Sequence, residues 1–566
     1  MILSIALFLG IFSILTLLLG LMGLLYPAFL VTFGSFVLFL ALIGLLRFRQ
    51  KAKFVWKFEL WQLFLWTPLA VLFSAITASL FLSPPIFDEL LYHLALPERF
   101  LLRHAVSSIP FNVYSNYPLN VEMLYVWGLL FPGIAVCRMI NFALGGLSAL
   151  VIYLIARKHF SREAGLMSVH LFLSMIGVGI LFASAFNDFG LTFFCLMSLF
   201  TLMNWQEKQG RIWLVLTGVF CGFALGTKYT AVVNLGIIML LVLMIGLMKK
   251  EKMKTQIIDL LLVLTFAFLT FSPWLIKNLW FTGNPVYPFF YEVFGGKGWN
   301  AFNAWRYGHF HGLAGPPAQG INKYLAMPSF LIFDFKKDIP LGFFWLIALP
   351  FLYFINRSDK KSWLLMMYFI PYSILWGLGI MLIRLLFPAM AVFSILGGRL
   401  IAETTGKKRF FWAIFALLAV GVMFNAYMVM DYTRGVSSGS GFREGLDLQA
   451  IAGVANLFVP PGEKILFVGE FRTFGFKRDV LAPTMFDTNA AEDWLERSEN
   501  FRDFSARLRR EKIDYILFSA YRAAWAQDNF KYFEKPENYE RFKLFLATAY
   551  VSGIAERGAY RLYRVN

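Results

Sequence analysis

The sequence predicts a membrane all-α protein with about thirteen transmembrane helices, followed by a small α/β domain outside the membrane. Hydrophobic residues make up 59% of the 566 residues and charged residues only 15%, a composition typical of chains that lie mostly in lipid. Apolar runs of about twenty residues, the length that crosses a bilayer, recur along most of the chain. After about Asp431 short apolar stretches alternate with charged helical ones, the pattern of a small soluble domain.

The N-terminal segment predicts a helical hairpin that is retained in the mature protein. It has no charged residue before Arg47 and is broken at Tyr26 and Pro27. A secretory signal would need a basic start, a shorter apolar core and a small-residue cleavage site. We therefore expect residues 1–58 to form an extra transmembrane hairpin with a basic cytoplasmic loop, ahead of a transmembrane core at residues 59–430.

The charged loops predict the orientation of the chain. Short basic loops alternate along the sequence with longer or less basic ones, and short basic loops stay in the cytoplasm. This places the N-terminus in the cytoplasm and the loops 84–118 and 278–340, together with the domain 431–566, on the periplasmic or extracellular side of a cell inner membrane. The net charge of +18 is explained by this topology, so we expect membrane lipids and no nucleic acid as partners.

The first outer loop predicts a helix that lies on the membrane surface. After two prolines the chain can begin a helix near Asp88. We expect its apolar side chains to face the lipid; these are Leu90, Leu91, Leu94, Phe100 and Leu101.

Two adjacent carboxylates, Asp88 and Glu89, stand at the start of this helix, with Tyr92 and His93 one turn on. One interpretation is structural: Asp88 caps the helix and Glu89 favours its N-terminal dipole. The other is catalytic, because a carboxylate at the membrane surface can deprotonate an acceptor while a sugar leaves a lipid phosphate.

Further polar residues mark the outer ends of later spans. Asp188 follows Asn187 between two apolar runs and is either a site residue or the N-cap of the next helix. Lys228 and Arg384 are cations next to apolar sequence, which are costly unless they meet an anion or water. A lipid phosphate suits both; the alternative is an interhelical pair with Asp188 or Glu122.

The second outer loop, residues 278–340, is long enough to be functional, and we expect it to act as a gate over a donor site. Its candidate residues are Tyr287, Arg306, Tyr307 and His309. His309 and His311 could bind a metal, but with alternate spacing and no acidic cluster nearby a solvated loop is the favoured interpretation.

Five segments together resemble the bacterial GT-C glycosyltransferases, relatives of the protein O-mannosyltransferases and aminoarabinose transferases. They are FDELLYHLALPERF, YSNYPLNVEMLYVWGL, GFALGTKYTA, SPWLIKNLWFTGNPVYPFF and IRLLFPAMAVFSILGG. The resemblance runs in order from about Trp61 to Leu400, which makes it more specific than any one motif. The two helices before Trp61 are not part of the minimal family core.

The resemblance implies the GT-C fold and an inverting hexosyl- or pentosyltransferase that uses a polyprenyl-phosphate sugar. An acidic residue in the first outer loop is the family's catalytic base, which maps onto Asp88 with Glu89 beside it. Asp188 maps onto a residue that holds the acceptor or orients the site, and we expect Tyr92 and His93 to assist there. Lys228 and Arg384 would bind the donor phosphate.

The acceptor, whether lipid, glycan or protein, is not predicted. We expect no cofactor: some distant relatives use a divalent metal, but a DxD cluster is lacking here. A non-catalytic GT-C scaffold subunit is the alternative function. A lipid or polysaccharide transporter would need polar residues in mid-membrane and repeated halves, and neither is visible in the sequence.

Overall fold

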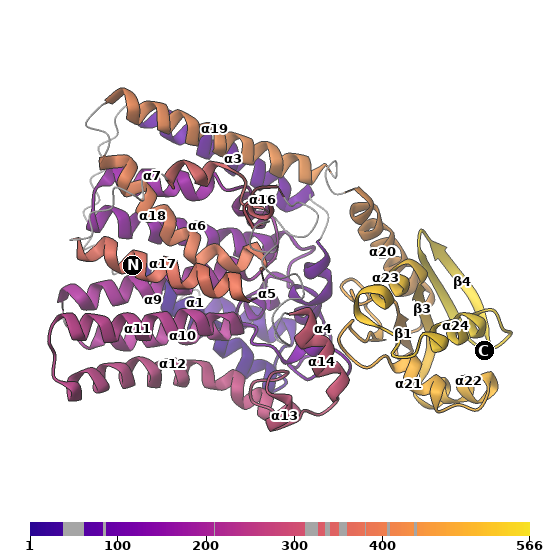
Figure 1. Ribbon diagram of the computed structural model, residues 1–566. Helices are drawn as coiled ribbons and strands as arrows, with labels where there is room; N and C mark the ends of the chain where they lie inside the picture. The colour runs from indigo at the N-terminus through magenta and orange to yellow at the C-terminus, as the bar shows by residue number, and fades with distance from the viewer. Residues whose placement is uncertain are drawn as a thin grey trace.

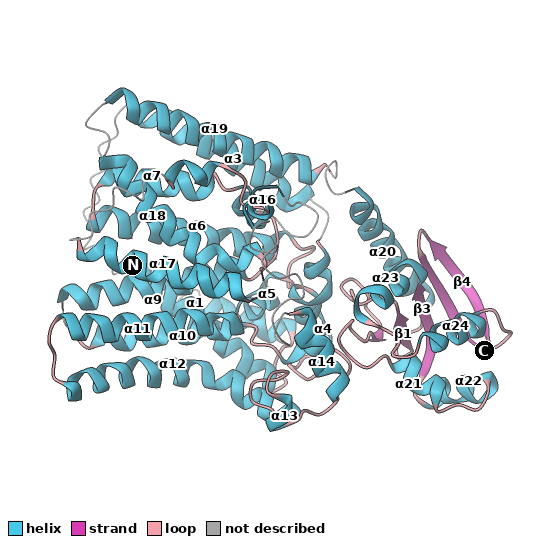
Figure 2. Cartoon of the chain, in the orientation of Figure 1, coloured by secondary structure: helices cyan, strands magenta, loops and turns pink. Residues whose placement is uncertain are grey.

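The computed structural model describes residues 1–37, 61–82, 86–208, 210–311, 327–333, 340–349, 359–379, 381–403, 408–434 and 439–566. In this part of the chain, helices form a bundle at the N-terminal side and all strands lie in the C-terminal domain (Figure 2). The basic loop before α3 and residues 312–326 of the second outer loop, with its glycine-rich and proline-rich stretch, are outside the described residues.

Seven helices of the described residues are long and apolar enough to cross a membrane, or eight if a bent pair counts as one span. The seven lie on α1 (Ile2–Leu21), α6 (Ala135–His159), α9 (Asp188–Lys208), α11 (Val232–Met248), α12 (Met253–Thr282), α18 (Phe387–Glu403) and α19 (Lys408–Thr433). The bent pair is α7 (Arg162–Leu173) and α8 (Ile176–Phe182), at 77°. The remaining long helices of the bundle are α3 (Trp61–Leu82), α10 (Ile212–Thr227) and α17 (Lys360–Leu378), and a shorter apolar helix spans Pro27–Val37.

The membrane all-α prediction is therefore confirmed. The expected count of about thirteen includes apolar runs ending at Leu46 and Phe354, and the last residues of both runs are outside the described residues. At the centre of the bundle lie α9 and α18, each with 94% of its span buried. Both are apolar around the whole circumference, as expected of a helix enclosed by other helices.

Short helices gather at the end of the bundle next to the C-terminal domain (Figure 1), which we call the domain-side end. They are α4 (Ala95–Leu102), α5 (Asn120–Gly128), α13 (Tyr291–Phe294), α14 (Ala301–Phe310) and α16 (Met327–Phe333), with a π-helical turn at Glu89–His93 and a 3-10 turn at Val113–Asn116. Both predicted outer loops thus meet at one end of the molecule.

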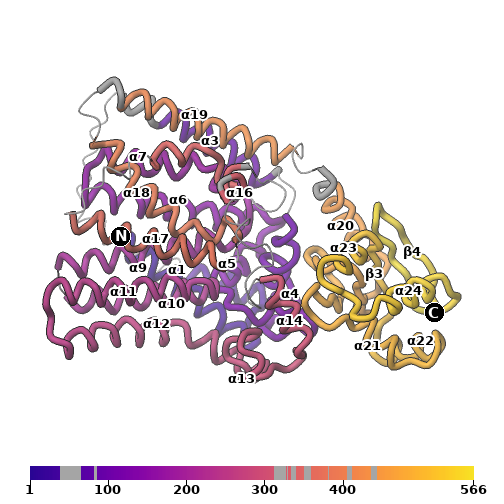
Figure 3. The backbone as a smooth tube through the Cα atoms, in the orientation of Figure 1, coloured from indigo at the N-terminus to yellow at the C-terminus, as the bar shows by residue number. Residues whose placement is uncertain are grey.

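The C-terminal domain is a five-stranded mixed sheet with helices around it. The chain passes from α19 through α20 (Gly439–Phe458) into this domain (Figure 3). The strand order is β2-β1-β3-β5-β4; β1 is parallel to β2 and β3, and β5 is antiparallel to β3 and β4. The strands are β1 (Lys464–Val468), β2 (Asp479–Leu481), β3 (Ile513–Ser519), β4 (Val551–Arg557) and β5 (Tyr560–Val565); the other helices are α21 (Ala490–Glu496), α22 (Phe501–Arg510), α23 (Ala520–Phe530) and α24 (Pro536–Leu546).

The predicted surface helix is wrong in one respect: its apolar side chains face protein and not lipid. Leu90, Leu91, Leu94 and Phe100 are at most 1% exposed, and Leu90 belongs to the core of the C-terminal domain. The reason is that the domain packs on this segment. Arg99, which is buried, donates hydrogen bonds to the backbone carbonyls of Arg478 (2.7 Å) and Thr473 (3.1 Å).

Candidate active site

Asp88 and Arg384 form an ion pair at the domain-side end of the bundle. The carboxylate Oδ2 of Asp88 lies 2.7 Å from Nη2 of Arg384, and the two side chains are 22% and 15% exposed. Asp88 stands just before the π-helical turn, and its side chain does not cap that turn. Arg384 precedes α18 in a short 3-10 helix and lies over the ring of Phe186 at 5.0 Å. The capping interpretation of Asp88 is therefore wrong.

Glu89 has a different environment from its neighbour. It is fully buried and holds Arg138 of α6 with two hydrogen bonds, of 3.1 Å from Nε and 2.9 Å from Nη2. Its carboxylate also accepts the backbone N–H groups of Ile86 (2.7 Å) and Ala185. A buried carboxylate with four donors is fixed in place and unavailable to a substrate, which marks Glu89 as structural.

Lys228 and Asp188 form the second ion pair, with Nζ and Oδ1 3.0 Å apart. Asp188 is fully buried at the start of α9, while Lys228 at the end of α10 is 20% exposed. The predicted interhelical alternative is thus correct for Lys228. Arg384 also pairs with a carboxylate, but with Asp88 and not with the expected Asp188 or Glu122.

His93 and Tyr92, both in the first outer loop, lie close enough to the two ion pairs to feel their charges. Nδ1 of His93 lies 2.6 Å from Oε1 of Glu122, and both side chains are fully buried. Glu122 is also bonded by the amide of Asn187 (3.0 Å). Burial and the charges of Asp88, Asp188 and Glu122 raise the pKa of Tyr92, while Arg384 opposes them. Four charged groups from four segments of the chain therefore act on one hydroxyl group, which links both ion pairs and Glu122 to Tyr92.

Aromatic side chains connect this site to the second outer loop. Tyr92 stacks on Tyr114 at 4.7 Å, and Tyr114 meets Tyr117 at 5.2 Å. The hydroxyl groups of Tyr117 and Tyr307 lie 2.6 Å apart. The loop predicted to gate the site is therefore in contact with it through a row of four tyrosines.

The other candidate residues of the second outer loop have partners outside the two ion pairs. Arg306 donates to the backbone carbonyls of Asp487 and Lys531 in the C-terminal domain, each at 3.3 Å. His309 stacks on Trp305 at 5.4 Å. Tyr287 is buried, and its carbonyl accepts the hydroxyl of Tyr229 at 3.1 Å.

The histidines His309 and His311 have partners of their own within the second outer loop. Among the residues that the structure describes, no group of three or more His, Cys, Asp or Glu side chains is placed to hold a metal ion. The buried Nδ1 of His311 bonds instead to the carbonyl of Tyr307 at 2.8 Å, within its own helical turn.

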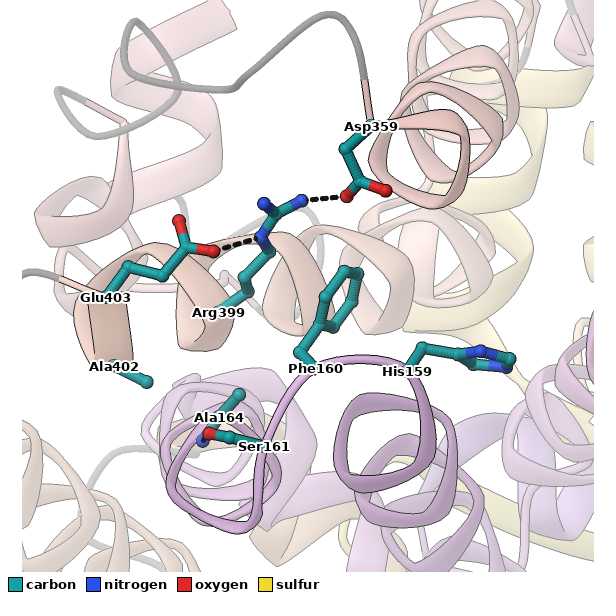
Figure 4. Close-up of a pocket in the computed structure, with 8 residues that line it drawn as sticks. All are labelled: His159, Phe160, Ser161, Ala164, Asp359, Arg399, Ala402 and Glu403. Carbon is teal, nitrogen blue, oxygen red and sulfur yellow. Dashed lines mark hydrogen bonds and ion pairs between the residues drawn. The ribbon is translucent and has the colours of Figure 1, made fainter.

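A cavity of about 430 Å³ lies at the opposite end of the bundle. Its lining includes Arg399 and Glu403 near the end of α18, about 25 Å along the helix from Arg384. Arg399 lies between two carboxylates, bonding to Glu403 at 2.7 Å and to Asp359 (Figure 4). This cavity is therefore remote from Asp88, and its cation is already neutralised.

Known proteins share this arrangement of helices and domain. A family model described as dolichyl-phosphate-mannose-protein mannosyltransferase matches residues 129–276. The crystal structure of ArnT from Cupriavidus metallidurans bound to undecaprenyl phosphate superposes with a TM-score of 0.61 at 14% identity, covering 89% of this chain and 98% of that one. The crystal structure of the same protein in the apo state superposes with a TM-score of 0.57 at 14% identity, covering 88% of this chain and 96% of that one. A comparison with curated proteins gives no match.

The long apolar helices and the fold define a multi-pass membrane protein with the architecture of ArnT. The family model covers residues 129–276, and its description agrees with the resemblance to GT-C glycosyltransferases that the sequence carries.

Sequence reasoning missed several residues that build the site. No sequence motif marked Arg138, the C-terminal arginines Arg472 and Arg522, or the pairing of Asn187 with Glu122. The one available signal was the burial cost of Arg138, a cation inside the apolar run of α6 that requires an acidic partner.

Proposed function

We propose that this protein transfers a sugar from a polyprenyl-phosphate donor to a lipid, glycan or protein acceptor at the outer face of the inner membrane. The observation that carries the proposal is the Asp88–Arg384 pair, a partly accessible carboxylate beside a partly accessible guanidinium. Undecaprenyl phosphate is bound by ArnT in the structure with the same fold, which supports a polyprenyl phosphate as the donor carrier.

In the proposed reaction, the donor phosphate competes with Asp88 for Arg384. The guanidinium binds phosphate oxygens as it binds a carboxylate, so donor binding releases Asp88. Lys228, which is 20% exposed, supplies a second positive charge for the phosphate, while Asp188 holds the lysine in place and orients the site.

The chemical step is a direct displacement. Asp88 takes the proton of an acceptor hydroxyl group, the acceptor oxygen bonds to the anomeric carbon, and the bond from that carbon to the phosphate oxygen breaks with inversion. Polyprenyl phosphate leaves with the electron pair, and its charge is stabilised by Arg384 and Lys228. The proton on Asp88 is then lost to solvent, which restores the enzyme without a covalent intermediate.

The orientation and the domain roles belong to the same proposal. Short basic loops are retained in the cytoplasm, so the N-terminus lies inside and the domain after Asp431 lies on the outer face with both outer loops. The loop carrying Tyr287, Arg306, Tyr307 and His309 acts as a gate whose movement reaches Asp88 through the row of tyrosines.

Binding of undecaprenyl phosphate to the purified full-length protein in lipid nanodiscs tests the proposal. Arg384→Gln and Lys228→Gln should each weaken binding about tenfold or more, because each removes a charge-assisted hydrogen bond. Lys208→Gln, at the far end of α9, is the matched control. Equal binding by all four proteins would contradict the proposal. The scaffold alternative instead predicts that Asp88→Asn leaves the protein's function unchanged.

A further inference from the structure

Two arginines of the C-terminal domain contact the ring of Phe87, the residue before Asp88. The guanidinium carbons of Arg472 and Arg522 lie 5.1 Å and 4.9 Å from the centre of the Phe87 ring. Both distances are within the range of attraction between a cation and an aromatic face. Phe87 is thus the contact through which this domain reaches the segment that carries Asp88.

The two arginines are themselves held firmly. Arg472, which is 2% exposed, bonds to Glu470 through Nε (2.9 Å) and Nη2 (2.7 Å), and to Glu444 at 2.8 Å. Arg522 bonds to both carboxylate oxygens of Glu444, with 2.7 Å to Oε2. Tyr560 donates to Glu444 and Glu470 at 2.9 and 3.0 Å.

The charges in this network balance, with two carboxylates for two guanidinium groups. Burial would raise the pKa of Glu470, but the neighbouring arginine and the hydrogen bonds hold it at about 2, so Glu470 stays ionised at neutral pH. A buried, fully bonded network of this kind has one geometry, because any shift leaves a charge without its partner.

The domain also holds the chain on the other side of Asp88. The carbonyl of Leu90 accepts the backbone N–H groups of Thr473 and Phe474 at 3.1 and 3.3 Å. The Leu90 side chain is fully buried in the core of the domain. Asp88 therefore stands between two residues, Phe87 and Leu90, whose positions the C-terminal domain fixes.

We infer that Arg472 and Arg522 are positioning residues that act through Phe87 to aim the Asp88 carboxylate at Arg384. This inference rests on the proposed function and assigns the C-terminal domain a part in it. A reacting group must be held to within a fraction of an ångström, since a displacement of about 1 Å can cost a hundredfold in rate. The backbone hydrogen bonds at Leu90 fix the path of the chain. The contacts of the two arginines with the Phe87 ring fix the direction of the Asp88 side chain.

A double-mutant cycle on undecaprenyl phosphate binding separates positioning from simple packing. Asp88→Asn should tighten binding about threefold or more, because it removes the carboxylate that competes for Arg384. Phe87→Leu should tighten binding in the same direction in the wild-type background and have no further effect in the Asp88→Asn background. Phe87→Tyr keeps an aromatic ring in contact with the two guanidinium groups and should bind like the wild type.

The controls guard against a folding defect. Tyr539→Leu removes an aromatic ring that lies under Lys543, at 4.7 Å, on α24 of the same domain, and should leave binding unchanged. Phe87→Met replaces Phe87→Leu if the latter lowers the thermal unfolding temperature of the full-length protein.

The outcomes distinguish the inference from the proposal beneath it. If Phe87→Leu changes binding by the same factor with and without Asp88, or in neither background, the positioning role is wrong. If Asp88→Asn and Arg384→Gln both leave binding unchanged, the proposed function fails and the inference falls with it.

Discussion

Asp88 and Glu89 are adjacent in the sequence, yet their carboxylates meet different arginines in opposite surroundings. Asp88 pairs with Arg384 where both side chains are partly accessible, at 22% and 15% exposed. Glu89 pairs with Arg138 where both are almost fully buried, at 0% and 1%. A π-helical turn begins at Glu89, directly after Asp88, and such turns are frequent at functional sites.

This contrast predicts opposite effects of the two matched amide substitutions. Glu89→Gln removes the carboxylate paired with a buried guanidinium and should cost about 3–5 kcal/mol of stability. Asp88→Asn leaves Arg384 partly accessible to water and should therefore cost less stability than Glu89→Gln, while sugar transfer is lost. Unfolding of the full-length protein in detergent measures both. A stable Glu89→Gln variant with an unstable Asp88→Asn variant would reverse the assignment of the two carboxylates.

The junction between the domain and the first outer loop predicts a dependence on pH. Asp487 accepts the N–H of Val113 at 3.1 Å, and burial raises the pKa of its carboxyl to about 6 from an ordinary 3.8. As the pH rises from about 4 to 6, the unfolded chain loses this proton first, so the folded state loses stability, by roughly 3 kcal/mol in all. Above pH 6 this loss is complete and constant.

Asp487→Asn, which keeps a neutral acceptor, should remove this dependence. The measurement is the difference in unfolding temperature between the two proteins from pH 4.5 to 7.5. The unfolding temperature of the variant should rise relative to that of the wild type as the pH rises to 6 and stay constant relative to it above that pH. Parallel curves would show that Asp487 ionises alike in both states.

Chelation is expected to leave binding of undecaprenyl phosphate unchanged. The phosphate-binding charges in the proposal are Arg384 and Lys228, and the described residues contain no cluster of three metal-binding side chains. Binding is measured before and after treatment with EDTA and again after adding Mn²⁺. A loss on chelation that Mn²⁺ restores would show that a metal takes part.

The sequence predicts the class of fold well because that signal is local. Apolar runs long enough to cross a bilayer and the change of pattern near Asp431 depend only on neighbouring residues. The positions of Lys228 and Asp188 next to apolar sequence also mark them as polar groups in need of a partner. That pair was among the stated alternatives, and the structure contains it.

What covers an apolar face is not a local property, and here the prediction from sequence was wrong. The apolar residues of the first outer loop, which include Leu90 and Leu94, have the same sequence pattern whether lipid or protein covers them. The covering surface is formed by residues such as Thr473 and Phe476, nearly four hundred positions later. For the same reason Arg384 could not be assigned to Asp88, since the pair depends on how separate segments meet in three dimensions.

The most direct test of the account is a structure of the full-length protein with undecaprenyl phosphate. The account predicts that the phosphate lies within hydrogen-bonding distance of Arg384 and Lys228, with the Asp88–Arg384 pair opened and Asp88 facing the space where an acceptor would bind. A phosphate bound elsewhere, with that ion pair intact, would contradict it.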